Sequence, residues 1–190
     1  MKRLIRRADI FTNSYRPGVN TRFGLLPAEL AEASERGLVC IDINAFGHSG
    51  PWSERPGFDQ NAQVASGFAA KEGEPGKPRF SPVFYLGDLV AGYFAAAGMM
   101  AALLRRSIEG GSYHVKISLA RSVMWVQELG FLETDAQTSL PEKDTYPAKM
   151  VSIGSVYGKL SFLVPSLTFS NLDLPKESSL SPYGAYSPDW

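Results

Sequence analysis

The chain has 190 residues, and its 19 lysines and arginines balance 19 aspartates and glutamates, so the formal net charge is zero. This length can bury one sizeable core, and the balance excludes the strongly basic surface that favours nucleic acid or an anionic membrane as a partner. A single cysteine, Cys40, excludes an internal disulfide and lies in an apolar run typical of a buried thiol. We therefore expect an intracellular, cytoplasmic protein. The basic N-terminus is not followed by the apolar segment of a secretory signal.

The first part of the chain alternates helix and strand patterns. Residues 2–8 have the pattern of a helix end, 9–14 of a short strand, 27–35 of a helix that opens on proline, and 38–45 of a buried strand. This order predicts an α/β fold with a parallel sheet and flanking helices. Because the chain opens on half of such a unit, we expect further material before Met1.

The next stretch is predicted to be a loop, a helix and a connection. Glycine–proline signals mark a loop at 47–57, and Asp59 is placed to cap a helix over 59–69. The polar, proline-rich residues 71–82 then lead to the longest apolar run of the chain.

That run lies between Asp88 and the pair Arg105–Arg106 and reads LVAGYFAAAGMMAALL. A helix that is apolar on all sides is typically buried, and the run is shorter than the ~20 residues needed to span a membrane. We therefore predict a mostly buried central helix that runs from Asp88 to about Arg106. The position of Asp88 at its start favours a helix cap over a catalytic nucleophile, and both alternatives remain open.

The remaining residues predict a strand at 113–117, a helix at 118–132 and a later strand at 156–164. The chain therefore divides into a core at 1–132, an exposed linker at 133–154, and a C-terminal strand with an irregular, extended tail at 155–190.

The side chains that could carry chemistry are few. No cysteine–histidine cluster has metal-ligand spacing, so we expect no metal. His114, in the middle of a strand, is more typical of a satisfied surface residue, whereas His48 lies on a glycine loop at a sheet end, where α/β folds bind ligands. Tyr15, Arg16 and Arg22 follow the first strand and could hold a phosphate and stack a base, although these residues taken alone are better explained as solvated arginines.

Three segments together resemble a known family. They are SYRPGVNTRFGL at 14–25, FGHSGPWSERPGFDQNAQVASG at 46–67, and GDLVAGYFAAAGMMAALLRR at 87–106 with the strand–helix segment that follows it. Their order and spacing resemble family III CoA-transferases, the CaiB/BaiF group of formyl-CoA transferase and L-carnitine CoA-transferase, which is related to α-methylacyl-CoA racemase. The resemblance covers 2–132 well and 155–190 loosely, and it implies a partial Rossmann-like domain.

The resemblance implies roles for individual residues. Asp88 stands where the family's catalytic aspartate attacks an acyl-CoA thioester, forms a mixed anhydride and then an aspartyl-CoA thioester, and passes CoA to a carboxylic acid. The residues that match CoA-contacting positions are Ser14, Tyr15, Arg16, Arg22, Gly57, Phe58 and Asp59. The implied substrates are acyl-CoA and a carboxylic acid, without a metal, and the implied assembly is a homodimer.

The departures from the family pattern define the alternatives. The family's opening nucleotide-binding half does not precede Met1, so we interpret the chain as a fragment that lacks it. A truncated, non-catalytic remnant or a partner-dependent subunit is the alternative to an active CoA-transferase. Racemase activity is less favoured, because Phe58 replaces the histidine base of the racemase relative and phenylalanine cannot transfer a proton.

Overall fold

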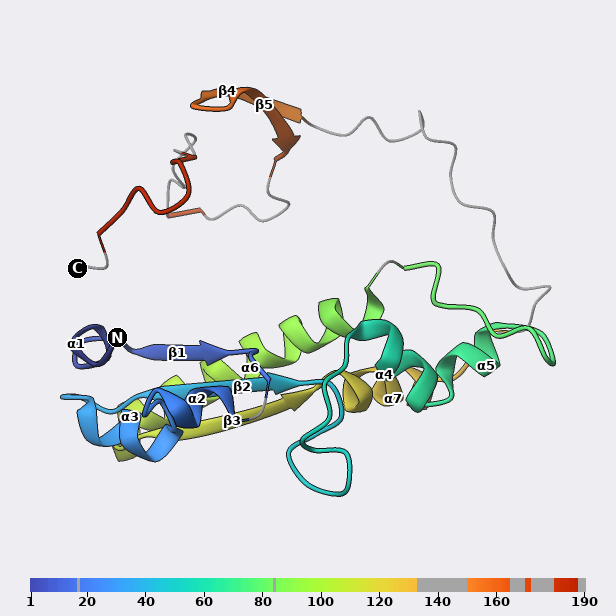
Figure 1. Ribbon diagram of the computed structural model, residues 1–190, viewed down its shortest axis with the longest axis horizontal. Helices are drawn as coiled ribbons and strands as arrows, with labels where there is room; N and C mark the ends of the chain where they lie inside the picture. The colour runs from blue at the N-terminus through green and yellow to red at the C-terminus, as the bar shows by residue number, and fades with distance from the viewer. Residues whose placement is uncertain (17, 84, 133–149, 165–169, 172–179, 188–190) are drawn as a thin grey trace. The chain divides into compact units, whose positions relative to one another are not determined.

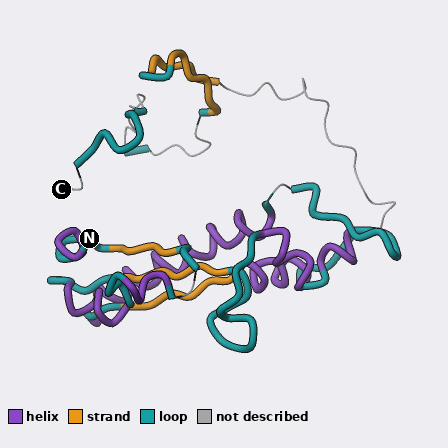
Figure 2. Tube along the Cα trace, in the orientation of Figure 1, coloured by secondary structure: helices purple, strands orange, loops and turns teal. Residues whose placement is uncertain are grey.

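The computed structural model describes residues 1–16, 18–83, 85–132, 150–164, 170–171 and 180–187 (Figure 1). The chain forms two compact units, the first ending at Phe131 and the second beginning at Leu132. Figure 2 shows that the first unit contains a sheet with helices around it and the second a strand pair.

The sheet of the first unit has three parallel strands in the order β1–β2–β3. Strands β1 (Ile10–Asn13), β2 (Val39–Asn44) and β3 (Tyr113–Ser118) pair in register, with Asn13 beside Asp42 and Asp42 beside Lys116. The predicted α/β class and parallel sheet are confirmed.

Helix α6 (Leu86–Glu109) packs on one face of this sheet through small side chains. Ala95 and Ala102 are buried in a cluster with Val39 and Ile41 of β2. The backbone also comes close to β3 at Gly98, where a Cβ atom would lie 2.7 Å from Val115 Cγ1. Small residues therefore set the distance between helix and sheet.

Helix α6 runs antiparallel to the strands. Near its C-terminal end Arg106 donates to Asp9 Oδ1 at 2.8 Å and to the Gly37 carbonyl at 3.0 Å, just before β1 and β2. The start of α6 therefore lies at the carboxyl ends of the strands (Figure 1).

Within the described part of the first unit, helices cover the other sheet face towards its amino ends. Helices α1 (Lys2–Ile5) and α3 (Pro27–Ala33) contribute Ile5 and Leu30 to a buried cluster with Cys40. Burial, and secondarily the charge of Asp42, raises the pKa of the Cys40 thiol to about 11. The prediction of a buried structural thiol is confirmed.

The remaining helices refine the predicted boundaries. They are α2 (Val19–Arg22), which the sequence analysis missed, α4 (Asp59–Ala65), α5 (Phe68–Glu72) and α7 (Leu119–Glu128). The single helix predicted at 59–69 is wrong, because Gly67, with φ of 80°, adopts the left-handed conformation between α4 and α5. Ser118 caps α7, as its hydroxyl accepts the Arg121 backbone N–H at 3.2 Å.

The expectation that α6 is mostly buried is also wrong. Tyr93 and Leu104 are 77% and 64% exposed, and Leu89 and Met100 are exposed as well. One face contacts the sheet, and no element in the described part of the first unit covers the opposite face.

At 24 residues α6 is also longer than the run of 16 uncharged residues in the sequence, and by length and composition alone it could cross a membrane. The packing of its alanines on the sheet instead fits a helix of an α/β layer.

The second unit contains an antiparallel hairpin of β4 (Met150–Ser155) and β5 (Gly158–Leu163). The single strand predicted at 156–164 is thus the second arm of a hairpin, and β4 lies where the sequence analysis predicted the end of a linker. Residues 133–149 and much of the predicted tail lie outside the described residues.

Candidate functional site

The residues predicted to act on CoA come from segments that meet at the carboxyl edge of the sheet. Ser14 to Arg16 follow β1, Gly57 and Phe58 end the loop after β2, and Asp88 lies in the first turn of α6. In open parallel sheets this edge is where ligands bind.

The start of α6 is held by a buried carboxylate from another helix. Asp59, which is 1% exposed, accepts the Gly87 backbone N–H at 2.6 Å and the Gln63 side-chain N–H at 2.5 Å. Gln63 in turn accepts the Ser81 backbone N–H at 2.8 Å. Gly87 is needed here because a Cβ atom would lie 2.6 Å from Asp59 Oδ1. The prediction that Asp59 caps its own helix is therefore wrong; it satisfies an N-terminal N–H of α6.

This arrangement bears on the cap interpretation of Asp88. The N-cap residue is Tyr85, which adopts φ of 57° and ψ of 48°, and no side chain of α6 itself caps the helix. Asp88 is the third helical residue, and its exposed carboxylate takes part in no hydrogen bond or ion pair within the described residues. The cap interpretation of Asp88 is wrong.

The pKa of Asp88 lies above its ordinary value. Partial burial of the carboxylate is the larger cause, and the negative charge of Asp59 is the second. A carboxylate that is accessible and not engaged by neighbours is suited to attack an electrophile.

The predicted CoA contacts are arranged in two groups. Ser14, Tyr15 and Arg16 are exposed directly after β1, and Arg22 is the last residue of α2. Tyr15 is 72% exposed, and its backbone N–H is fixed by Asn13 Oδ1 at 3.0 Å.

The second group lies before α4. Gly57 packs so closely on Phe46 and Ala45 that a Cβ atom would lie 2.8 Å from each, whereas Phe58 is 74% exposed. The Asp59 side chain is enclosed by its own contacts, so Phe58 is the exposed member of this group.

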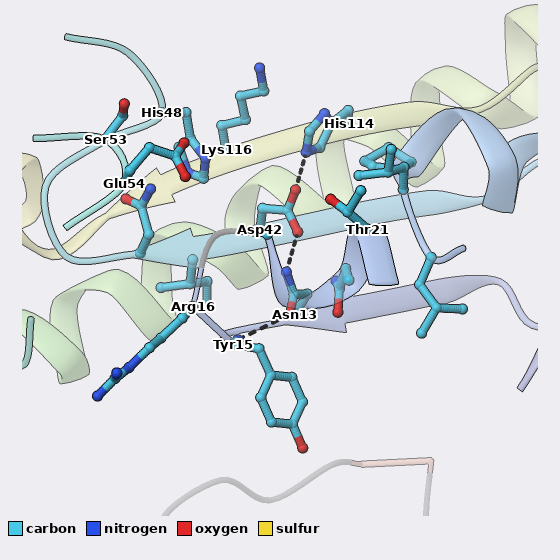
Figure 3. Close-up of a pocket in the computed structure, with 17 residues that line it drawn as sticks. Asn13, Tyr15, Arg16, Thr21, Asp42, His48, Ser53, Glu54, His114 and Lys116 are labelled. Atoms are coloured by element: carbon cyan, nitrogen blue, oxygen red, sulfur yellow. Dashed lines mark hydrogen bonds and ion pairs between the residues drawn. The ribbon is translucent and has the colours of Figure 1, made fainter. Parts of the chain in front are cut away.

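A pocket of about 270 Å³ lies at the same edge, on the sheet face opposite α6 (Figure 3). Strands β1, β2 and β3 supply its floor with Asn13, Asp42, Asn44, His114 and Lys116. Its walls include Tyr15 and Arg16 on one side and His48, Ser53 and Glu54 on the other. Of the residues predicted for CoA, only Tyr15 and Arg16 line it.

The floor contains a hydrogen-bonded chain across the three strands. Asp42 Oδ1 accepts from Asn13 Nδ2 at 2.9 Å, and Asp42 Oδ2 contacts His114 Nε2 at 2.7 Å. His48 Nε2 lies 3.0 Å from the Ile117 carbonyl oxygen. The sequence analysis missed Asp42, Asn13 and Lys116, although the alternation of Asp42 and Lys116 with apolar residues in 38–45 and 113–117 signals a polar sheet face. Among the described residues, no three histidine, cysteine or acidic side chains gather as a metal site requires.

The chain is similar to proteins that transfer CoA. The model of CoA-transferase family III matches residues 1–157. Succinyl-CoA–D-citramalate CoA-transferase of Chloroflexus aurantiacus is 32% identical over 67% of this chain and 32% of its own length. Acetyl-CoA:oxalate CoA-transferase of Acetobacter aceti is 33% identical over 61% of this chain and 30% of its own length.

Solved structures agree. A crystal structure of the probable fatty acyl-CoA transferase of Mycobacterium tuberculosis matches with a TM-score of 0.62 and 31% identity, over 68% of this chain and 36% of that one. The chain thus spans about a third of the length of these relatives. With the family model matching most of its residues, the chain belongs to CoA-transferase family III.

Proposed function

We propose that the chain carries the nucleophile of a CoA-transferase that moves CoA from an acyl-CoA thioester to a carboxylic acid. The observation that carries the proposal is the state of Asp88. Its carboxylate stands at the carboxyl edge of the sheet, in the first turn of α6, while Asp59 performs the structural task that Asp88 would otherwise have.

The proposed reaction has four balanced steps. An Asp88 oxygen attacks the thioester carbonyl, which forms a mixed anhydride and releases CoA thiolate. The thiolate attacks the aspartyl carbonyl, which gives an aspartyl-CoA thioester and frees the donor acid. The acceptor carboxylate attacks this thioester, which forms a second mixed anhydride and releases CoA thiolate. The thiolate attacks the acceptor's acyl carbonyl in that anhydride, which gives the acceptor acyl-CoA and releases the Asp88 carboxylate. Each step requires an unprotonated nucleophile, so the raised pKa of Asp88 sets an acid limit to activity.

The CoA molecule is proposed to lie along the exposed side chains at this edge. Tyr15 and Phe58 offer aromatic faces, and Arg16 and Arg22 offer guanidinium groups suited to phosphate. Ser14 and the backbone at Gly57 complete this surface. Asp59 acts in the proposal by positioning α6, because its buried carboxylate has no free approach to a ligand.

The test of the nucleophile is covalent capture. The chain is incubated with succinyl-CoA, and the peptide containing Asp88 is examined by mass spectrometry for a CoA adduct. We expect the adduct in the unmodified chain and in the control Glu32→Gln, which alters an exposed carboxylate of α3, and none in Asp88→Asn. An adduct that persists in Asp88→Asn would mean that another carboxylate is the nucleophile.

CoA binding is tested separately by calorimetry. Arg22→Ala should weaken binding by about 1.5–3 kcal/mol if Arg22 makes a charge-assisted phosphate contact. Arg36→Ala is the matched control, because Arg36 precedes β2 at the amino edge of the sheet. Equal affinities of the two variants for CoA would show that Arg22 is a solvated surface residue without a phosphate contact.

A second candidate function is a partner-dependent or non-catalytic role within this family. The exposed apolar face of α6 favours it. The proposed partner is a second family III chain, in a homodimer or a larger assembly, in the cytoplasm. CoA binding without any covalent adduct would favour this role over catalysis.

A further inference from the structure

The outer face of helix α6, on the side away from the sheet, carries Asp88 together with the large exposed apolar residues of the helix. Asp88 is exposed at its start, and the exposed apolar side chains that follow are Leu89, Tyr93, Met100 and Leu104. Residues four apart on a helix lie on one face, so Asp88 and these side chains share the same surface. Whatever packs on this surface therefore also forms a wall beside Asp88.

The large side chains of this face are arranged symmetrically about its centre. They form pairs that lie equally far from the midpoint between Ala96 and Ala97, and the pairs are Leu89 with Leu104 and Tyr93 with Met100. A two-fold axis through this midpoint would place each side chain against its counterpart in a second copy of the chain. The face is thus self-complementary, as an interface between identical chains requires.

Small residues occupy the centre of the face. Gly92, Ala96, Ala97 and Ala101 are all exposed. Two helices that cross at an angle are closest at the crossing point and diverge on either side of it. Small side chains at the centre permit a close approach, and the larger side chains towards each end fill the widening gap. The order of sizes therefore fits a helix pair that crosses near Ala96.

The charges on this face indicate the direction of the second helix. Asp88 lies near its start and Arg105 near its end, equally far from the midpoint. A parallel second helix would place each charge against its own copy, whereas an antiparallel helix places Asp88 against Arg105 at both ends. Arg105 Nε donates to Glu109 at 3.0 Å, yet its side chain is 65% exposed and has further N–H donors. Charge complementarity thus favours the antiparallel arrangement.

We propose that two copies of this chain pair through the outer faces of α6, antiparallel and about a two-fold axis next to Ala96, and that the partner's Arg105 lies beside Asp88. Asp88 is ~13 Å along the helix from this axis, where the helices have diverged, so a thioester can still approach it. Within the described residues no cation of the same chain forms an ion pair with Asp88. The partner supplies that cation, and this part rests on the proposed role of Asp88 as nucleophile.

Cysteine cross-linking tests the arrangement, and analytical ultracentrifugation measures the dissociation constant of the dimer. Cys40 is buried and should not cross-link, so the unmodified chain gives the background. Ala96→Cys should form a disulfide-linked dimer with itself, because it lies next to the axis. Leu104→Cys should not, since two copies of that residue lie ~22 Å apart along the helices, but it should cross-link when mixed with Leu89→Cys.

Charge variants test the contact between Asp88 and Arg105. Arg105→Glu should weaken association about three- to tenfold, because it places a like charge against Asp88 twice in each dimer. Asp88→Lys combined with Arg105→Glu recreates the pair with its signs exchanged and should restore the affinity. Glu109→Gln is the control, because it removes the contact of Arg105 within its own helix and should leave the dimer unchanged.

The proposal is overturned if the chain stays monomeric at the highest attainable concentration, or if Leu104→Cys cross-links with itself and not with Leu89→Cys. It is also overturned if the charge exchange fails to restore association while circular dichroism shows that the helix content is kept. Binding of an uncross-linked monomer to lipid vesicles would overturn it in favour of a membrane as the cover of this face. None of these measurements needs acyl-CoA, so failure here is distinct from the absence of a covalent adduct at Asp88.

Discussion

At the residue scale, Asp88 and Asp59 are two carboxylates near each other with opposite tasks. Asp88 has a pKa above its ordinary value of 3.8, so the folded protein keeps this proton at pH values where the unfolded chain has lost it. The ionised form therefore opposes folding above the folded-state pKa, and this effect vanishes below 3.8.

The direction of this pKa shift predicts how removal of the Asp88 charge changes stability. Asp88→Asn should be at least as stable as the unmodified chain at neutral pH, because it removes a disfavoured charge with little change of volume. The stability difference should shrink as the solution is acidified. Urea unfolding of both proteins, at neutral pH and at the most acidic pH where both stay folded, measures it. A marked loss of stability at neutral pH would show that the Asp88 charge stabilises α6 after all.

Asp59→Asn should behave in the opposite way. The side-chain oxygen of an asparagine can still accept the Gly87 N–H. Its NH₂ group would then face the side-chain NH₂ group of Gln63, so that two donors meet. The side-chain oxygen of Gln63 offers no alternative, because it already accepts the Ser81 backbone N–H. A buried donor left without an acceptor costs about 1–3 kcal/mol, and we expect a loss of unfolding free energy of that size. Asp88→Asn is the matched control, and equal effects of the two substitutions would argue against a structural role specific to Asp59.

At the scale of the element, α6 depends on glycine at some positions and merely tolerates it at others. Gly98→Ala would place a Cβ atom 2.7 Å from the stiff Val115 side chain, so we expect a destabilisation of about 1–3 kcal/mol. A Cβ atom added at Gly92 would meet open space, and Gly92→Ala should stabilise the protein by about 0.5–1 kcal/mol through helix propensity. Thermal unfolding compares the pair, and a gain of stability from Gly98→Ala would contradict the close helix–sheet contact.

The elements also show which features can be read from the sequence. Strand and helix periodicity located β1, β2, β3 and α6, because local patterns specify them. The contact of Asp59 with Gly87 joins residues 28 apart, and that of Asp42 with His114 residues 72 apart, so neither has a local signature. The same holds for α6 exposure: an apolar run shows that a helix can be buried but not which segment would cover it.

At the scale of the whole molecule, the exposed face of α6 should control self-association. This face is formed by Leu89, Tyr93, Met100 and Leu104, and large apolar patches of this kind are typical of interaction sites. The unmodified chain should therefore associate in solution. The double substitution Tyr93→Lys and Leu104→Glu should shift it towards the monomer in light scattering without loss of helix content. Phe23→Lys changes an exposed aromatic residue after α2 and serves as control. An equal shift in the control would show that association does not depend on α6.

The two anchors of α6 have a consequence for how this chain can vary in length. Asp59 fixes the helix at Gly87, and Arg106 fixes it at Asp9 and Gly37. One inserted or deleted residue between these anchors would turn one end by about 100° and shift it by about 1.5 Å relative to the other. Either Asp88 would leave the carboxyl edge of the sheet, or Arg106 would lose its partners. Substitutions on the outer face of α6 leave both anchors in place, whereas a change in the number of residues between Gly87 and Arg106 does not.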